Sequence, residues 1–260
     1  MTSFLDLHVP GSPLLLPNPW DAGSARVLAH LGFRALATTS SGFAATLGRF
    51  DGAVTRDEAL AHAAAVVAAV DVPVSADLEN GFAHDPDEVA ETVRQALAAG
   101  LAGCSIEDST GDKTDPIYDR GLAAERVAAA VGAAGEGFVV TARSENFLHG
   151  HDDLADTIGR LQAFQEAGAH VLYAPGITTA EQIGAVVSSV DRPVNVLAMP
   201  GVPPVGELAG LGVARVSVGG AFMFAALGAL ADAGRQLLAG DYGWAEQART
   251  GRAAIAAAFG

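Results

Sequence analysis

The sequence predicts a single α/β domain over residues 1–260, folded as a TIM-type (β/α)8 barrel. Short apolar or β-branched runs alternate with Ala-rich amphipathic segments, at roughly one strand and one helix per 30 residues. The length of 260 residues is also close to the roughly 250 typical of such a barrel. Strict alternation implies a parallel sheet, and eight strands favour a closed barrel over an open doubly wound sheet.

Eight segments are short, apolar and bounded by turn residues, and we expect each to form a strand. In chain order they are Leu14–Asn18, Ala35–Ser40, Val72–Asp77, Gly103–Glu107, Phe138–Arg143, His170–Ala174, Val194–Ala198 and Arg215–Gly219. Amphipathic segments between them end near glycine or a short turn and are expected to be helices. The clearest are Arg56–Val70, Pro86–Ala99, Ala123–Ala133, Leu154–Ala167 and Thr179–Val190.

The composition and charge of the chain exclude several classes of function. Hydrophobic residues make up 50% of the chain and charged residues 17%, which indicates a compact fold and not a disordered chain. The formal net charge of −15 is opposite to that of a surface for nucleic acid or an anionic membrane, so neither partner is expected. An anionic substrate would therefore need a local cation, either a metal ion or a well-placed arginine.

The single cysteine and the absence of a long apolar run bear on the cellular location. Cys104 is the only cysteine, so no intramolecular disulfide can form, and we expect an inert thiol in the core. The N-terminal residues lack a basic region followed by an apolar core, and the longest apolar run, around Ala63–Val70, is too short to span a bilayer. We expect a cytoplasmic protein with no membrane partner.

Polar side chains follow four of the predicted strands, at the ends where parallel barrels carry their active sites. The segments are Thr38–Phe43, Ala76–Phe82, Ser105–Asp108 and Thr141–Glu145. Asp77 and Glu79 are two residues apart, so on an extended segment their side chains point the same way, and Glu107 ends the next strand. Three converging carboxylates repel, and without a cation at least one should be protonated. A divalent ion with oxygen ligands, such as Mg²⁺, resolves this repulsion; alternatively, the acids cap helices or pair with arginine.

A cation and a glycine at the strand ends could bind an anion. Arg143 ends the fifth predicted strand, where its planar guanidinium could grip a carboxylate or phosphonate, or instead pair with Glu107 or Glu145. In the segment 41–43, Ser-Gly-Phe, the glycine lets the backbone approach a ligand closely and offer N–H groups to an anion. The residues alone leave both roles of Arg143 open.

Eight motifs follow one another in a fixed order along the chain. They are PNPWDAGSA, TSSG, LGRFDG, ADLENGF in the place of D-x-D-x-G-[YF], SIEDS, TARSENF, GAHVLYAPG and RPVNVL. In these motifs the sequence resembles the isocitrate lyase/phosphoenolpyruvate mutase superfamily, from about Asn18 to about Phe224. The resemblance implies a barrel whose final helix is exchanged between subunits, within a homodimer or homotetramer.

The resemblance also implies a metal site. It assigns Asp77 as the direct ligand of Mg²⁺, or of Mn²⁺ in its place, with Glu79 and Glu107 holding the ion partly through water. Asp51 would lie close to this group.

By the same resemblance, a small anionic organic acid would be the ligand. Its anionic groups would be held by Arg143 and by the backbone of Ser41, Gly42 and Phe43, and Asn195 would line the pocket.

Two departures from the superfamily concern proton transfer. Its lyases carry a K-[KR]-C-G-H loop with an acid/base cysteine, but the segment 109–115 has none; Lys113 and Thr114 match the phosphonomutase K-T-N-S, and Asp115 replaces the asparagine. A carboxylate there would repel a transferring phosphoryl group. Pro175 stands where the lyases have Glu and the mutases His. Proton transfer would then fall to Tyr173, Asp51 or Asp115.

The pair His149 and His151 has metal-like spacing, but we expect it in a loop that partly covers the site.

Three functions follow from these expectations. The first is a Mg²⁺-dependent lyase that cleaves a C–C bond of a small 2-hydroxy or 2-oxo di- or tricarboxylate through a metal-stabilised enolate, as in 2-methylisocitrate lyase or oxaloacetate decarboxylase. The second is a P–C bond enzyme, either a phosphoenolpyruvate phosphonomutase or a phosphonopyruvate hydrolase. The third is a protein that binds a 2-oxo acid and Mg²⁺ with little catalysis, which the missing acid/base residues favour.

Overall fold

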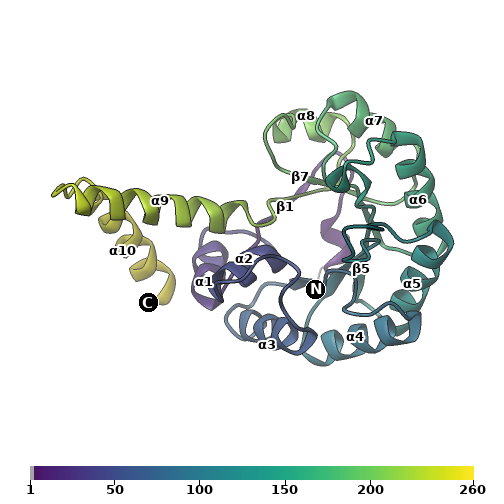
Figure 1. Ribbon diagram of the computed structural model, residues 1–260, viewed down its shortest axis with the longest axis horizontal. Helices are drawn as coiled ribbons and strands as arrows, with labels where there is room; N and C mark the ends of the chain where they lie inside the picture. The colour runs from purple at the N-terminus through teal and green to yellow at the C-terminus, as the bar shows by residue number, and fades with distance from the viewer. Residues whose placement is uncertain (1–2) are drawn as a thin grey trace.

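The computed structural model describes residues 3–260 and contains eight parallel strands in one nearly closed barrel (Figure 1). The strands are β1 (Leu14–Leu16), β2 (Leu36–Ala37), β3 (Val74–Asp77), β4 (Gly103–Glu107), β5 (Val139–Arg143), β6 (Val171–Tyr173), β7 (Val194–Leu197) and β8 (Arg215–Ser217). Their order is β1-β8-β7-β6-β5-β4-β3-β2. The N–H of Ala37 donates to the carbonyl of Pro17 at 3.1 Å, which brings β2 beside the end of β1. The predicted (β/α)8 barrel is confirmed.

Helices alternate with the strands, and α1 and α3 to α8 cover the outside of the barrel (Figure 1). They are η1 (Leu5–Leu7), α1 (Ala22–His30), α2 (Ser40–Thr46), α3 (Arg56–Val67), α4 (Pro86–Ala98), α5 (Arg120–Ala133), η2 (Asn146–His149), α6 (Leu154–Glu166), α7 (Ala180–Ser188), α8 (Val205–Gly210), α9 (Ala221–Leu238) and α10 (Ala245–Phe259). Local capping sets several starts: Thr55 and Thr179 form capping boxes, and Asp85 caps α4. Helix α5 begins at Arg120, earlier than predicted, because the Asp119 carboxylate accepts from the first turn.

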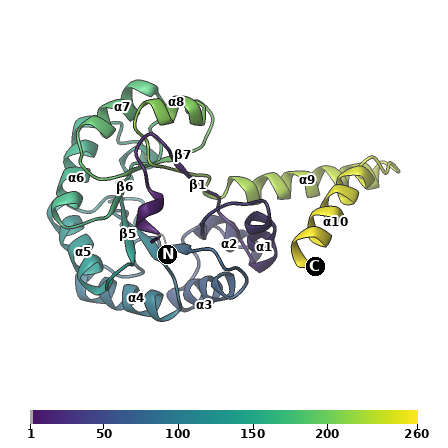
Figure 2. The ribbon, with the colours of Figure 1, turned by 180° about the vertical axis from the view of Figure 1, so that it is seen from behind.

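The hydrophobic core has two parts, one outside and one inside the ring of strands. Between the strands and the outer helices, buried helix side chains such as Val93 of α4 and Phe164 of α6 pack in the core. Inside the barrel, Phe4 and Leu7 of the N-terminal segment pack on Leu14. Figure 2 shows this segment lying across the middle of the barrel. The bottom of the barrel is therefore plugged by apolar side chains, and polar groups are left to the opposite end.

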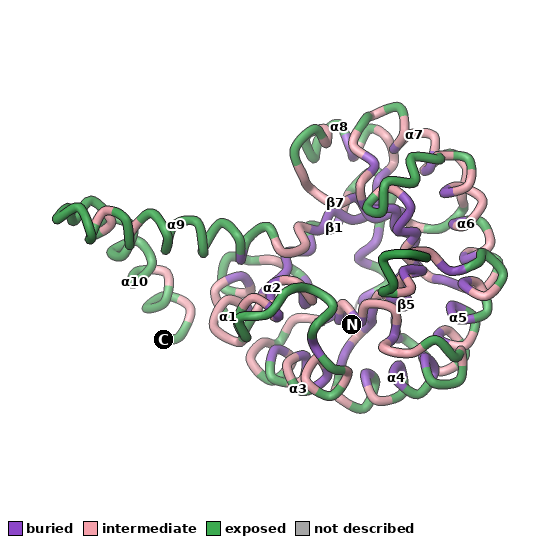
Figure 3. Tube along the Cα trace, in the orientation of Figure 1, coloured by how far each residue is buried: buried purple, intermediate pink, exposed green. Residues whose placement is uncertain are grey.

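Helices α9 and α10 form an arm that leaves the barrel (Figure 1). Helix α9 is exposed along nearly all of its length, with Met223 as its one buried residue (Figure 3). Helix α10 returns beside α1, where Arg26 stacks on the ring of Phe259 at 4.7 Å. The helix that follows β8 thus does not pack on the wall of its own barrel. Within residues 3–260, no helix combines the length and apolarity needed to cross a membrane, and the cytoplasmic location stays a prediction.

Candidate active site

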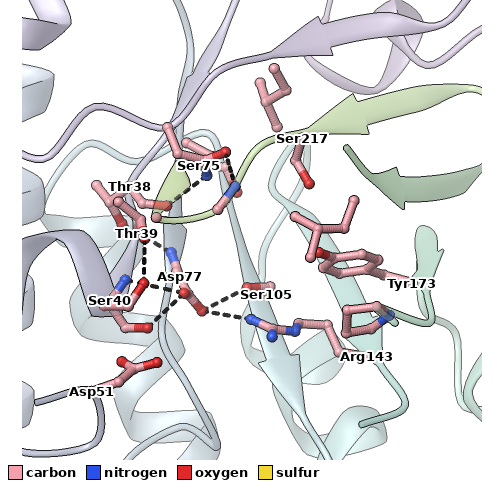
Figure 4. A pocket seen from close by; sticks show the side chains of 18 of the residues that line it. Thr38, Thr39, Ser40, Asp51, Ser75, Asp77, Ser105, Arg143, Tyr173 and Ser217 are labelled. Atoms are coloured by element: carbon pink, nitrogen blue, oxygen red, sulfur yellow. Dashed lines mark hydrogen bonds and ion pairs between the residues drawn. The ribbon is translucent and has the colours of Figure 1, made fainter. Parts of the chain in front are cut away.

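The carboxyl ends of the strands surround a cavity of about 180 Å³ (Figure 4). Its lining includes Ser40, Asp51, Asp77, Arg143 and Tyr173. A second cavity of about 350 Å³ lies beside the first, and Ser40, Asp51 and Arg143 line both. The second cavity also reaches the acids and the loop that follow β3, β4 and β5, namely Glu79, Glu107, Lys113, Glu145 and His149. The predicted convergence of polar strand ends is present.

Arg143 is the centre of the charged cluster. Its Nη1 lies 3.0 Å from Asp77 Oδ1 and 3.3 Å from Glu107 Oε2, and its Nε donates to Glu145 Oε1 at 2.8 Å. Its guanidinium also lies over the ring of Tyr173, 5.2 Å from the centroid. The parallel register explains this position, because Glu107 and Tyr173 flank Arg143 on the neighbouring strands. One cation therefore contacts three carboxylates.

Asp77 is held on both of its carboxylate oxygens. Oδ2 accepts from the backbone N–H of Ser40 at 3.2 Å and from its hydroxyl at 3.0 Å. Oδ1 accepts from Ser105 Oγ at 3.3 Å and from Arg143 Nη1 at 3.0 Å (Figure 4). Helix α2 begins at Ser40, so its first N–H points at this carboxylate. These contacts fix one oxygen ligand at the mouth of the barrel.

Glu79 reaches the site by a route that differs from the expected one. Strand β3 ends at Asp77, and Glu79 has a φ of 49°, in the left-handed region that non-glycine residues rarely adopt. The prediction that Asp77 and Glu79 project together from an extended segment is therefore wrong, although Asp77 lines the first cavity and Glu79 the second. The carbonyl of Glu79 accepts from the N–H of Glu107 at 3.0 Å, which anchors this turn to the next strand. Backbone strain of this kind is typical of functional sites.

Burial and mutual repulsion shift the acids towards their neutral forms. The pKa of Glu79 rises to about 8, chiefly through burial and then through the charges of Asp77 and Asp51. Burial also raises the pKa of Asp51 and, despite the nearby Arg143, the pKa of Glu107 well above its usual range. Negative charge in the cluster exceeds what a single guanidinium neutralises. The site therefore has the electrostatic deficit that the sequence predicted.

The donor set fits a hard divalent cation. Carboxylate and hydroxyl oxygens are the ligands that Mg²⁺ and Mn²⁺ take, and Mg²⁺ commonly binds through one or two carboxylates and several waters. Among residues 3–260, no three His, Cys, Asp or Glu side chains are drawn together into a ready-made cage. Asp77 and Glu107 instead turn towards Arg143. An ion would enter by sharing these carboxylates with the arginine.

The predicted anion-binding segment contributes less backbone than expected. Ser41 lines the first cavity, but Gly42 lies in the first turn of α2, and its N–H donates to Thr39 Oγ1 at 3.3 Å. A Cβ at Gly42 would come within 2.5 Å of Thr39 Cγ2, so close packing explains the glycine. Phe43 stacks on His62 with ring centroids 3.9 Å apart. Their role in substrate binding stays a prediction.

The remaining predicted residues lie at different depths. Tyr173 lines the first cavity, and burial raises its pKa to about 12. Asn195 is fully buried and bonds Arg215 Nε and Ser217 Oγ, each at 2.9 Å. Asp115 is exposed on the loop after β4.

Comparison with known proteins decides the family. The sequence profile described as phosphoenolpyruvate phosphomutase matches residues 4–238. The chain belongs to this family. As a phosphoenolpyruvate phosphomutase family member, it is 37% identical over 240 residues to an uncharacterized protein of Mycobacterium tuberculosis, covering 92% of this chain and 90% of the relative. The 2-methylisocitrate lyase of Escherichia coli is 29% identical over 209 residues, covering 73% of this chain and 70% of the lyase.

Solved structures of the same superfamily share the fold. One from Burkholderia cenocepacia J2315, provisionally assigned as a lyase/mutase, has 54% identity and a TM-score of 0.88 over 90% of this chain and 86% of that chain. 2,3-Dimethylmalate lyase has 30% identity and a TM-score of 0.79 over 88% and 83%. Phosphonopyruvate hydrolase bound to oxalate and Mg²⁺ has 25% identity and a TM-score of 0.80 over 89% and 84%. The predicted superfamily is confirmed.

Two buried side chains of this phosphomutase family member lie outside the cavities. The first, Cys104, was predicted from the sequence, and the second, Arg126, was missed. Cys104 is buried and its pKa is raised by burial, as expected for an inert thiol. Arg126 of α5 is also buried, and it donates to the carbonyls of Ala83 at 2.5 Å and His84 at 2.7 Å and to that of Asn80. Its guanidinium lies over the ring of Tyr118, 4.2 Å from the centroid. Arg126 thus ties down the turn that carries Glu79.

The raised pKa of Glu79 predicts a pH effect on stability. Because the folded protein keeps this acid protonated between its ordinary 4.5 and about 8, the unfolded chain binds fewer protons there. Stability in EDTA should therefore fall as pH rises through this window, and the slope should flatten in Glu79→Gln. Thermal unfolding by circular dichroism measures this, with the exposed Glu125→Gln as a control. Constant or rising stability through the window would contradict the shift.

Arg126→Lys tests the support of the turn. Lysine keeps the charge but cannot donate to three carbonyls in one plane, so the turn should loosen around Glu79. We expect Mn²⁺ affinity to fall by about 10–100-fold, the usual cost of losing an outer support of a metal ligand. Electron paramagnetic resonance titration of Mn²⁺ measures this, with the exposed Arg94→Lys as the matched control. Unchanged affinity in a folded Arg126→Lys protein would show that the turn needs no such support.

Proposed function

We propose that this protein is a Mg²⁺-dependent lyase that cleaves a C–C bond of a small 2-hydroxy or 2-oxo di- or tricarboxylate. The observation that carries the proposal is the cluster of acids around Arg143 at the cavity, in which negative charge exceeds the positive charge of the one arginine. A cation and an anionic substrate together satisfy this cluster better than either does alone. The relatives named as lyases support the reaction class.

The chain's own residues would divide the work. Asp77, Glu79 and Glu107 would hold the ion, and its charge, when bound, would stabilise negative charge that develops on a substrate oxygen. Arg143 would turn its fork from these acids to a substrate carboxylate. Asp51, whose pKa is raised, lies in position to accept a proton. Tyr173, protonated to about pH 12, can donate one but is a poor base at neutral pH.

The second candidate is cleavage of a P–C bond. The likeness to phosphonopyruvate hydrolase favours it, as do Lys113 and Thr114 in the loop after β4. Asp115 weighs against it, because its carboxylate in that loop would repel a phosphoryl group. A third candidate, a 2-oxo acid binding protein with little catalysis, draws support from the loop without cysteine and from Pro175.

A substrate panel separates the three candidates. Candidate acids, including 2-methylisocitrate, 2,3-dimethylmalate and oxaloacetate, are incubated with and without Mg²⁺, and products are identified by NMR. Phosphorus NMR follows phosphonopyruvate in parallel. Turnover of phosphonopyruvate with none of any carboxylate would replace the lyase with the P–C enzyme. Metal-dependent binding without any product would favour the binding protein.

Asp77→Ala should abolish metal-dependent binding and leave the barrel folded. The carboxylate faces a cavity and adds to the crowded negative charge, so its loss should not cost core packing. Calorimetric titration of oxalate in the presence of Mg²⁺ should show no binding to Asp77→Ala, and the exposed Asp57→Ala should bind as the parent does. Unfolding of Asp77→Ala would instead indicate that the acid is a structural partner of Arg143.

We also propose that the protein assembles as a homodimer or homotetramer through the arm. Helix α9, which leaves the barrel and is exposed along nearly all of its length (Figure 3), has the exposed apolar side chains Phe224, Leu227 and Leu230. An apolar helix face of this kind needs a partner, and a second copy offers the barrel wall that its own α9 leaves uncovered.

Light scattering after size exclusion measures the assembly. We expect a dimer or tetramer in the parent, a smaller species for Leu227→Glu with Leu230→Glu, and no change for the exposed Asp232→Asn on the same helix. A parent protein that is monomeric at micromolar concentration would overturn the assembly.

A further inference from the structure

A second arginine lies inside the barrel, below the acidic cluster. Arg215, at the start of β8, is only 4% exposed, yet it lines the first cavity. Its Nε donates to Asn195 Oδ1 at 2.9 Å, and its Nη1 donates to Thr141 Oγ1 at 3.0 Å and lies 3.3 Å from His8 Nε2. Asn195 and Thr141 are uncharged acceptors, and burial lowers the pKa of His8 to about 3, so that His8 is neutral as well. Arg215 is thus a buried cation solvated by uncharged groups.

Arg215 has no counter-charge in the part of the chain that the structure describes. Within residues 3–260, no carboxylate lies within ion-pair distance of it, whereas Arg143 contacts three. Burial, together with the nearby positive charge of Arg143, lowers the pKa of Arg215 to about 10. A buried charge without a partner is costly, and proteins keep such groups where they meet a ligand or another charge. Its Nη2 makes no hydrogen bond to any described residue, which leaves one face of the fork free for the cavity.

The position of Arg215 gives the cavity two unlike ends. Thr141, which accepts from Arg215, precedes Arg143 by two residues on β5, about 6–7 Å along the strand. The acidic end with Asp77 and Arg143 therefore lies at the mouth, and the Arg215 end lies one layer deeper. Ser217 follows Arg215 by two residues on β8 and also lines the cavity; its hydroxyl oxygen accepts from Asn195 at 2.9 Å, and the hydroxyl is also hydrogen-bonded with Tyr173. Hydrogen-bond donors without a nearby acid are the chemistry of an anion site.

We infer that Arg215, with Ser217, forms a subsite for a second anionic group, so that the preferred ligand is a short diacid with a carboxylate at each end. This inference rests on the proposed function, because the first carboxylate would bind with the metal ion at the mouth. The depth of one strand layer fits a chain of four or five carbons. A ligand with a methyl group in place of the distal carboxylate would bring no negative charge to Arg215, and it should therefore bind more weakly.

Matched pairs of acids test the subsite. Malate is compared with 2-hydroxybutyrate, and 2-oxoglutarate with 2-oxovalerate; in each pair only the distal carboxylate differs. Calorimetric titration is carried out on the full chain with Mg²⁺, together with oxalate, which occupies the metal end alone. We expect the diacid of at least one pair to bind about tenfold or more tightly than its partner. Oxalate binding with no diacid preference would overturn the subsite, whereas the absence of metal-dependent oxalate binding would overturn the proposed function.

Variants of Arg215 assign the preference to this residue. Arg215→Gln should bring the ratio within each pair close to one and leave oxalate affinity within about threefold, and the exposed Arg192→Gln should keep the parent ratio. If Arg215→Gln fails to fold, Arg215→Lys and Ser217→Ala replace it, and each should reduce the ratio. A diacid preference that survives in a folded Arg215 variant would show that another group reads the distal carboxylate.

Discussion

The site depends on a single imbalance of charge. Arg143 contacts Asp77, Glu107 and Glu145, and Asp51 and Glu79 border the same cavities, so one guanidinium serves a cluster of acids. Pairing with an arginine does not remove the cost of burying these charges, which is why the pKa values of Glu79 and Glu107 remain raised. A divalent cation, as proposed above, would correct this imbalance reversibly.

The barrel creates this imbalance through register and through one strained turn. Neighbouring parallel strands bring Glu107, Arg143 and Tyr173 to one level, without any need for long loops. Glu79 requires more, since its left-handed backbone persists only where surrounding contacts hold it. Arg126 supplies them from outside the ring, with donors to the carbonyls of the same turn. A helix on the outer wall thereby contacts the turn that carries an acid at the mouth of the barrel.

The sequence predicted the parts of the site that follow from strand ends and missed those that follow from packing. Asp77, Glu107 and Arg143 end apolar runs, and parallel topology alone brings such ends together. Glu79 does line a cavity at the strand ends, but the two-residue period from which this was predicted ends with β3 at Asp77, and its role as a metal ligand stays a prediction. Gly42 looked like a ligand contact but is explained by the neighbouring Thr39. The sequence did not predict the role of Arg126, because a single arginine in an Ala-rich helix is expected to point into solvent. Only the structure shows the turn that it contacts.

The interior of the barrel separates recognition of charge from transfer of protons. The acids at the mouth and Arg215 below them are placed by strands, which are rigid, and they can bind an anionic acid whatever the chemistry that follows. Proton transfer in the superfamily's lyases uses a loop cysteine, and here that loop carries Lys113 and an exposed Asp115 instead. Of the groups that remain in the cavity, Tyr173 is held protonated mainly by burial, and burial followed by the charge of Asp77 raises the pKa of Asp51. Nearby negative charge adds to both shifts, so a cation bound at the site would lower the pKa of Asp51, making it a stronger acid and a weaker base. Different residues would therefore bind charge and move protons, yet the proposed ion and the proton carriers would remain coupled through the field in the cavity.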